Sequence, residues 1–304
     1  MKRLSTLLLL ILGLSISFSA CKKENDDDDI NNDGINSDPA LNPSEHPRLI
    51  LKFVFDSTQV RLNAFGQPTT VPSGRAAQSP VFRKMSGHYV ELAQNDFTAI
   101  GGGAVLFKNL ETTAGGDKAI DFEESKVVGP GEEFFSMPLS QIPAGSYKWL
   151  RVSLAYQNYD VKVKFLGNQF TGTVASFIGY NTYIKTYSPL NVPIAVNDDK
   201  AQGYWAFEAF GQVTSGQAPA GATTVVNPLF LNSPLPSGSC LVTGQFAGSN
   251  MVITGNETDD IVVEVSLSTN DSFEWIDNGD GIYEPEAGDV VIDMGIRGMI
   301  PTVQ

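Results

Sequence analysis

Beyond its N-terminal segment, the sequence consists of short apolar runs separated by clusters of Gly, Pro, Asn and Asp, and no run keeps a helical period with caps at both ends. Residues 49–55 show the pattern well, because Leu51, Phe53 and Phe55 alternate with other positions and share one face of an extended chain. Strands of this length at this spacing favour an all-β fold, an antiparallel β-sandwich, over a sheet built from β-α-β units.

The same alternation predicts a series of further strands, of which residues 147–156 are the clearest. The others are predicted at residues 88–92, 101–107, 118–122, 159–166, 170–183, 203–213, 238–246, 251–253, 261–267 and 290–301. Proline and glycine predict an irregular segment that ends at residue 79. We therefore expect one β-sandwich domain over residues 48–304, and a sub-boundary near residue 165 remains an alternative.

The first twenty residues have the organisation of a signal peptide. Lys2 and Arg3 precede the apolar run of residues 4–14, and small and hydroxylated residues then lead to Cys21. A membrane-spanning helix is the competing interpretation, but the apolar run is about half of the ~20 residues that a bilayer requires. The sequence therefore predicts a signal peptide over residues 1–20.

The segment that ends at Cys21 resembles the lipobox of bacterial lipoproteins. Ser19 and Ala20 provide the small residues of that motif, whereas Phe18 stands where Leu is usual. The resemblance implies lipidation of the Cys21 thiol, with diacylglycerol and an N-linked acyl chain such as palmitate. Several acyl chains give a durable membrane anchor where one chain is marginal. We expect the mature protein to be held at the outer membrane through this lipid.

A charged linker follows over residues 21–47. Its first part, residues 22–29, contains no apolar residue and is expected to be a solvated, self-repelling tether. Acidic residues directly behind the acylated cysteine also resemble the export signal of surface lipoproteins in Bacteroidota. The sequence leaves two locations open, the periplasmic leaflet and the cell surface.

The linker also contains the beginning of a calcium-loop pattern. Asp29, Asn31 and Asp33 place oxygen ligands at alternate positions, and Gly34 follows them. Ala40 occupies the position at which a calcium loop closes with a bidentate Glu. The alternatives are a calcium site and a hydrated tether.

Charge and the scarcity of histidine restrict the function. The net charge of −14 becomes −16 when Lys2 and Arg3 are removed, so nucleic acid is a poor partner. The chain has only two histidines, His46 and His88, and no G-x-S-x-G motif. We therefore expect no enzyme and no catalytic residue. The sequence also predicts no intrachain disulfide, because a lipidated Cys21 leaves Cys240 as the other cysteine.

The segment over residues 273–289 is the most patterned part of the C-terminal half. Asp277, Asp280, Glu284 and Asp289 are candidate ligands of a non-standard calcium site. The alternative is a tight turn with Gly279 or Gly281 in the left-handed conformation, which needs no metal.

A further resemblance is to the MbnP-like copper-binding proteins, a periplasmic β-sandwich family. It covers about residues 49–165 and rests on short motifs at residues 51–53, 63–68, 88–92, 119–122 and 143–147. The resemblance implies copper handling, with His88 as the metal ligand and Trp149 as a weaker candidate. The alternative for His88, placed near the start of a predicted strand, is a hydrogen-bonded structural imidazole. From residue 170 onward, the sequence resembles other lipoproteins with a similar Phe-Glu-Trp segment.

Three classes of function follow from these observations. The first is a non-enzymatic lipoprotein that binds or presents an envelope protein or small ligand through its loops. The second is copper or other metal handling, and the third is a fimbrial or adhesin-type subunit that assembles by strand addition.

Overall fold

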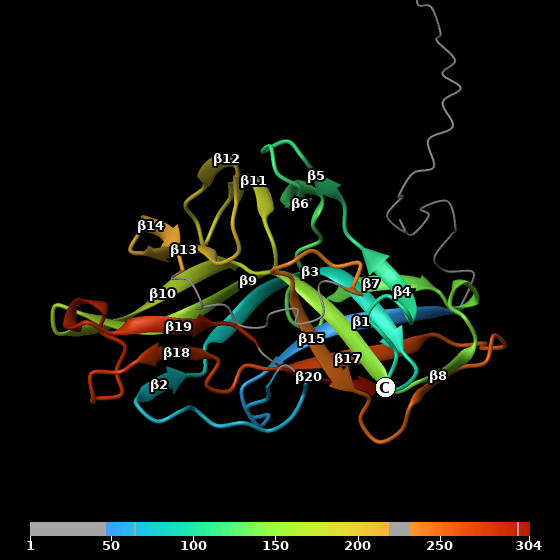
Figure 1. Cartoon of the computed structure of the whole chain (residues 1–304). Coiled ribbons are helices and arrows are strands. Elements are labelled where there is room, and N and C mark those ends of the chain that lie inside the picture. The colour runs from blue at the N-terminus through green and yellow to red at the C-terminus, as the bar shows by residue number, and fades with distance from the viewer. Residues whose placement is uncertain (1–46, 64, 219–231, 297) are drawn as a thin grey trace, which may run out of the picture. The chain divides into compact units, whose positions relative to one another are not determined.

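The computed structural model describes residues 47–63, 65–218, 232–296 and 298–304 (Figure 1). The predicted signal peptide and nearly all of the predicted linker, including Cys21, Asp29, Asn31 and Asp33, lie outside these residues. Among the described residues the elements are strands and short 3-10 helices, with no α-helix, so the predicted all-β class is confirmed. None of the described helices has the length and hydropathy needed to cross a bilayer.

The elements, in chain order, are β1 (Arg48–Asp56), β2 (Arg75–Gln78), β3 (Val81–Ala93), β4 (Ala104–Lys108), β5 (Glu111–Thr112), β6 (Ala119–Asp121), η1 (Phe122–Glu124), β7 (Glu133–Pro138), η2 (Leu139–Gln141), β8 (Gly145–Tyr147), β9 (Trp149–Phe165), β10 (Asn168–Phe177), β11 (Thr182–Tyr187), β12 (Ile194–Lys200), β13 (Tyr204–Ala209), β14 (Gln212–Gln217), β15 (Cys240–Gln245), β16 (Met251–Ile253), β17 (Ile261–Ser268), β18 (Phe273–Ile276), η4 (Pro285–Ala287), β19 (Val290–Met294) and β20 (Met299–Val303).

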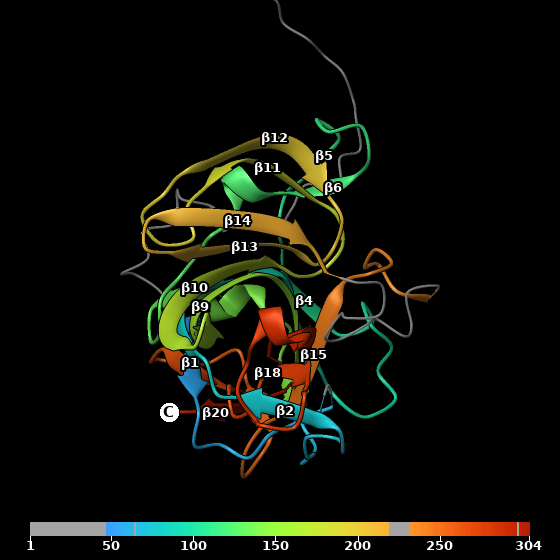
Figure 2. The ribbon, with the colours of Figure 1, turned by 90° about the vertical axis from the view of Figure 1, so that its left-hand side faces the viewer.

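A curled seven-stranded sheet is built around β9. Its order is β14-β13-β10-β9-β3-β4, and β15 pairs with part of β9. All of these pairs are antiparallel, and Figure 2 shows β9 and β10 bending along their length. Bulges in the β3–β9 ladder, between Phe82 and Lys84 and around Gly87, increase twist and curvature locally.

A four-stranded sheet joins the two ends of the described chain. Its order is β20-β17-β1-β7, and β1 runs parallel to β17, with Leu49 opposite Ile261 and Phe53 opposite Val265. The second parallel pair is β6 with β11. The prediction of antiparallel pairing is therefore wrong for these two pairs. Parallel partners need long connections, which periodicity within one strand cannot reveal.

The main core lies between these two sheets. Phe53 of β1, Val265 of β17, Val152 of β9 and Cys240 of β15 are fully buried in one apolar cluster. Complete burial of a large aliphatic or aromatic side chain contributes about 1.5–3 kcal/mol. Residues before and after Phe165 share this cluster, so one core includes both sides of the sub-boundary considered near residue 165. Phe165 is the last residue of β9 in the β9–β10 hairpin.

The remaining strands form smaller sheets, with orders β12-β11-β6-β5, β19-β18-β2 and β16-β8. A second apolar cluster, containing Phe177 and Tyr187, lies against the first of them. Fully buried Phe273 and Trp275 of β18 join the main core. The sheet of β18 and β19 therefore packs against the curled sheet.

Candidate functional site

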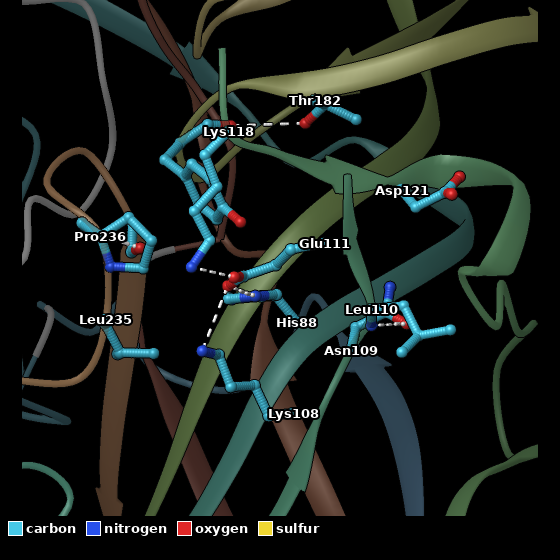
Figure 3. Close-up of polar contacts among 12 residues, drawn as sticks. His88, Lys108, Asn109, Leu110, Glu111, Lys118, Asp121, Thr182, Leu235 and Pro236 are labelled. Atoms are coloured by element: carbon cyan, nitrogen blue, oxygen red, sulfur yellow. Dashed lines mark hydrogen bonds and ion pairs between the residues drawn. The ribbon is translucent and has the colours of Figure 1, made fainter. Parts of the chain in front are cut away.

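His88 forms the centre of a buried polar cluster (Figure 3). It lies inside β3 and not near its start, in the bulged part of the ladder with β9. Its Nε2 is 3.2 Å from Glu111 Oε1, and Lys118 Nζ lies 2.5 Å from Glu111 Oε2. Lys108 Nζ is 3.3 Å from the same carboxylate, and the ring of Tyr180 packs edge-on against the imidazole.

The charges of this cluster stabilise one protonation state. Burial lowers the pKa of His88, although the hydrogen bond with Glu111 opposes the shift. Burial raises the pKa of Glu111, but His88 and Lys118 outweigh it, and the pKa lies well below its ordinary value. His88 is therefore a neutral imidazole near neutral pH, and its Nε2–H donates to an ionised Glu111.

This geometry matches the structural interpretation of His88, and copper binding stays a prediction. Nδ1 of His88 has no hydrogen-bond partner among the described residues. Trp149 pairs with Ala93, and at about 3.3 Å per residue this lies roughly 16 Å along β3 from His88. The Trp149 indole donates to Asp96 at 2.7 Å. Within the described part of the chain, no group of three or more His, Cys, Asp or Glu side chains is placed to hold a metal ion.

The four acidic candidates near the C-terminus lie in the loop between β18 and β19. Asp277 accepts hydrogen bonds from the backbone N–H groups of Gly279 and Gly281, and Asp280 accepts one from Ile282. Both glycines have left-handed backbones, with φ of 113° and 72°.

The other two candidate ligands of this loop also have protein partners. Asp289 accepts from the N–H groups of Asn278 and Glu284, and the Glu284 carboxylate contacts Lys164 Nζ at 2.6 Å. The carboxylates of Asp277, Asp280 and Asp289 thus satisfy the backbone donors of a tight turn, the arrangement of the metal-free alternative. Calcium binding by this loop stays a prediction.

A cavity of about 380 Å³ lies between the curled sheet and the β18–β19 hairpin. Strands β9, β10, β13 and β14 provide one wall, and β18, β19 and the loop between them provide the other. The described residues that line it are Val161, Val163, Val174, Trp205, Phe207, Thr214, Gln217, Ala218, Phe273, Tyr283, Pro285, Asp289, Val290, Val291 and Met294. The lining is predominantly apolar, with three large aromatic side chains in addition to Tyr283.

The cavity follows from side-chain alternation on neighbouring strands. Trp205 and Phe207 are two residues apart on β13 and share a face, as do Val161 and Val163 on β9. Gly172 leaves the room for one of these rings, because a Cβ there would lie 2.0 Å from Cζ of Phe207. The apolar interior of the cavity is therefore a property of the strand faces.

Sequence reasoning missed this cavity. The alternation of Trp205 and Phe207 was a usable signal of a strand face, but nothing in the sequence indicates that β19 forms the facing wall. The two walls come from segments far apart in the chain, and their register depends on tertiary packing.

Two further carboxylates, of Glu274 and Glu91, are buried and form ion pairs with arginines. Glu274 of β18 is fully buried and forms ion pairs with Arg61 and, at 2.6 Å, with Arg75. Glu91 of β3 is also fully buried, and it accepts from the N–H groups of Gly101 and Gly103 and pairs with Arg151. Buried charges require such partners, so we assign both carboxylates structural roles.

The chain was also compared with known proteins. No protein-family model, no curated protein and no solved structure matches it.

Proposed function

We propose that this chain is an exported lipoprotein, anchored to the outer membrane through Cys21, whose β domain binds a small apolar ligand. The observation that carries the binding proposal is the cavity of about 380 Å³ lined mainly by apolar and aromatic side chains. Ligand sites typically have volumes of about 300–1,000 Å³, apolar walls and a few polar groups. The cavity has room for one ring with a short chain.

The anchoring proposal is supported by the sequence before β1. The signal peptide, Cys21 and the acidic linker are consecutive, and the described fold begins with β1 at Arg48. A linker of about 26 residues reaches at most roughly 90 Å when extended. The domain would be held at the membrane while its cavity remains accessible from the aqueous phase. We propose surface exposure as the more specific location, on the basis of the acid behind Cys21.

We propose a binding role without catalysis, because the cavity lining contains no histidine, cysteine, serine or lysine among the described residues. The lining groups that could act as a general base or a nucleophile are Thr214, Tyr283 and Asp289, and no histidine or lysine lies beside them in the described lining to activate them. We also propose to class the domain as a β-sandwich. The support for this class is the shared core between the sheet around β9 and the sheet that contains β1 and β17.

Lipidation is tested by labelling with palmitate in a lipoprotein-producing bacterium. We expect label in the native chain and none in Cys21→Ser, and the substituted chain should lose its mature membrane-bound form. Absence of label from the native chain would exclude the anchor.

Ligand binding is tested with 4-phenylbutanol, a neutral molecule that has one ring and a short chain. The full lipidated chain is placed in phosphatidylcholine nanodiscs, and calorimetry against empty nanodiscs measures the affinity. Val174→Phe fills the cavity and should weaken binding at least tenfold. The matched control Val81→Phe introduces the same side chain at an exposed position and should leave binding unchanged. Absence of binding of 4-phenylbutanol by the native chain would exclude a neutral apolar ligand of this size.

A further inference from the structure

The cavity has one charged group at its wall. Among the described residues that line it, Asp289 is the one Asp, Glu, Lys, Arg or His. Asp289 is 6% exposed, and its two carboxylate oxygens accept hydrogen bonds from Asn278 N at 3.0 Å and Glu284 N at 2.7 Å. These contacts fix the carboxylate in place. Each oxygen has a second lone pair, so the group can accept a further donor.

The loop that carries Asp289 is strongly acidic. Residues 277–289 contain no Lys or Arg and five acidic residues, which are Asp277, Asp280, Glu284, Glu286 and Asp289. Lys164, from the end of β9, contacts Glu284 and so offsets one of these charges. The wall formed by this loop therefore has a negative potential, which attracts cations and repels anions.

The opposite wall also favours a cation with an apolar body. Trp205 and Phe207 present aromatic rings to the cavity, and aromatic faces attract ammonium groups as well as apolar groups. Tyr283 lies on the acidic side of the cavity. Burial raises the pKa of Tyr283 to about 12, and the nearby negative charge of Asp289 acts in the same direction.

We propose that the ligand of this cavity is a cationic amphiphile, an aromatic or short alkyl body that carries one amine, with the amine at Asp289. The proposal rests on the proposed binding function and adds the chemical class of the ligand. The apolar body lies against Trp205 and Phe207, and the ammonium donates a charge-assisted hydrogen bond to the carboxylate.

Three probes of the same length test this class. They are 4-phenylbutylamine, 4-phenylbutanol and 4-phenylbutyrate, which differ only in a cationic, neutral or anionic end group. We measure their dissociation constants by calorimetry with the full lipidated chain in phosphatidylcholine nanodiscs, against empty nanodiscs. We expect the amine to bind at least tenfold tighter than the alcohol, and the carboxylate to bind more weakly than both. Higher salt should reduce the advantage of the amine.

Asp289→Asn tests the assigned carboxylate. It should bring the dissociation constants of the amine and the alcohol to within about twofold of each other, because the charge contrast disappears. Asp259→Asn removes one negative charge at an exposed position outside the cavity lining, and it should preserve the preference for the amine. The comparison of three probes on the native chain needs no substitution, so it decides the matter even if Asp289→Asn disturbs the loop.

The outcomes separate this inference from the proposed function. Binding of the alcohol with equal or weaker binding of the amine overturns the charge preference and leaves the apolar site. Tightest binding of 4-phenylbutyrate also overturns it. Failure of all three probes to bind excludes the site itself, together with the inference.

Discussion

Arg75 and Glu274 form an ion pair of 2.6 Å between residues that lie 199 positions apart in the sequence. The pair connects the edge strand β2 to β18, which carries two fully buried aromatic residues of the main core. Arg61 binds the second oxygen of the same carboxylate. Glu274 thus connects two N-terminal segments, at Arg61 and at Arg75, to the β18–β19 hairpin.

Substitution Glu274→Gln should strongly destabilise the fold. The amide keeps the shape of the side chain, but it leaves the buried guanidinium of Arg61 without a counter-charge. Removal of one partner of a buried ion pair costs about 3–5 kcal/mol. Urea unfolding of the full chain measures the loss. Glu264→Gln, a half-buried position of β17, is the control and should change the midpoint little. Equal midpoints for the two variants would contradict the role of Glu274.

His88 should make the protein less stable in mild acid. Burial lowers the pKa of His88 in the folded state, whereas an unfolded histidine titrates near about 6.5. As the pH falls through this value, the unfolded state takes up the proton first. The contribution to stability is complete above pH ~6.5 and is lost below it, by at most about 1.4 kcal/mol per pH unit for one proton.

The measurement for His88 is the free energy of unfolding between pH 7 and pH 5. His88→Gln keeps an N–H donor for Glu111 but does not titrate, so it should flatten the pH dependence. His46→Gln alters the other histidine of the chain and should leave the dependence unchanged. A flat native profile, or an unchanged slope in His88→Gln, would show that another group controls acid stability.

The loop of residues 277–289 should depend on its glycines and not on a metal. Gly279→Ala should destabilise the fold by at least about 1–2 kcal/mol, because the backbone of Gly279 has a φ of 113°, which a residue with a Cβ rarely adopts. A Cβ there would meet no atom within 4 Å, so no steric collision adds to this cost. The cost is then one of backbone conformation alone. Gly145→Ala, where a Cβ makes only ordinary contact, is the control. Thermal midpoints in calcium and in a chelator should agree, and a rise in calcium would favour the metal-binding alternative.

Gly172 should affect ligand binding indirectly, through the position of Phe207, because Gly172 itself does not line the cavity. A methyl group on Gly172 would collide with the ring of Phe207, which lines the cavity. We expect Gly172→Ala to reduce stability by about 1–3 kcal/mol and to weaken binding of the phenylbutyl probes. Adding Phe207→Leu should recover part of the stability, because the collision disappears. A double-mutant cycle measures this coupling, and additive effects would argue against it.

The sequence predicted individual strands better than their partners. The predicted run at residues 251–253 coincides with β16, and the run at 261–267 is within one residue of β17. Most of the runs at 147–156 and 159–166 belong to one continuous strand, β9, in which polar Gln157 and Asn158 are buried, whereas residue 147 ends β8. Alternation identifies an extended chain with a buried face, but it does not show where polar residues find partners inside.

Site prediction was limited for the same reason. The sequence favoured a hydrogen-bonded imidazole at His88, and the structure shows such a bond. It did not identify Glu111 as the partner, because that residue lies in a two-residue strand whose position depends on β6. The turn chemistry of residues 277–289 is local and was therefore readable. The cavity depends on long-range packing and was not.

The parallel pairing of β1 with β17 has a consequence for the order in which the fold can form. Leu49 and Ile261 are partners in this ladder, although 212 positions separate them in the chain. If the chain is exported as we propose, β1 crosses the membrane long before β17 does. Strand β1 would then remain without its partner β17, with its apolar face exposed, until most of the chain has crossed the membrane. Secretion intermediates would be natural clients of periplasmic chaperones.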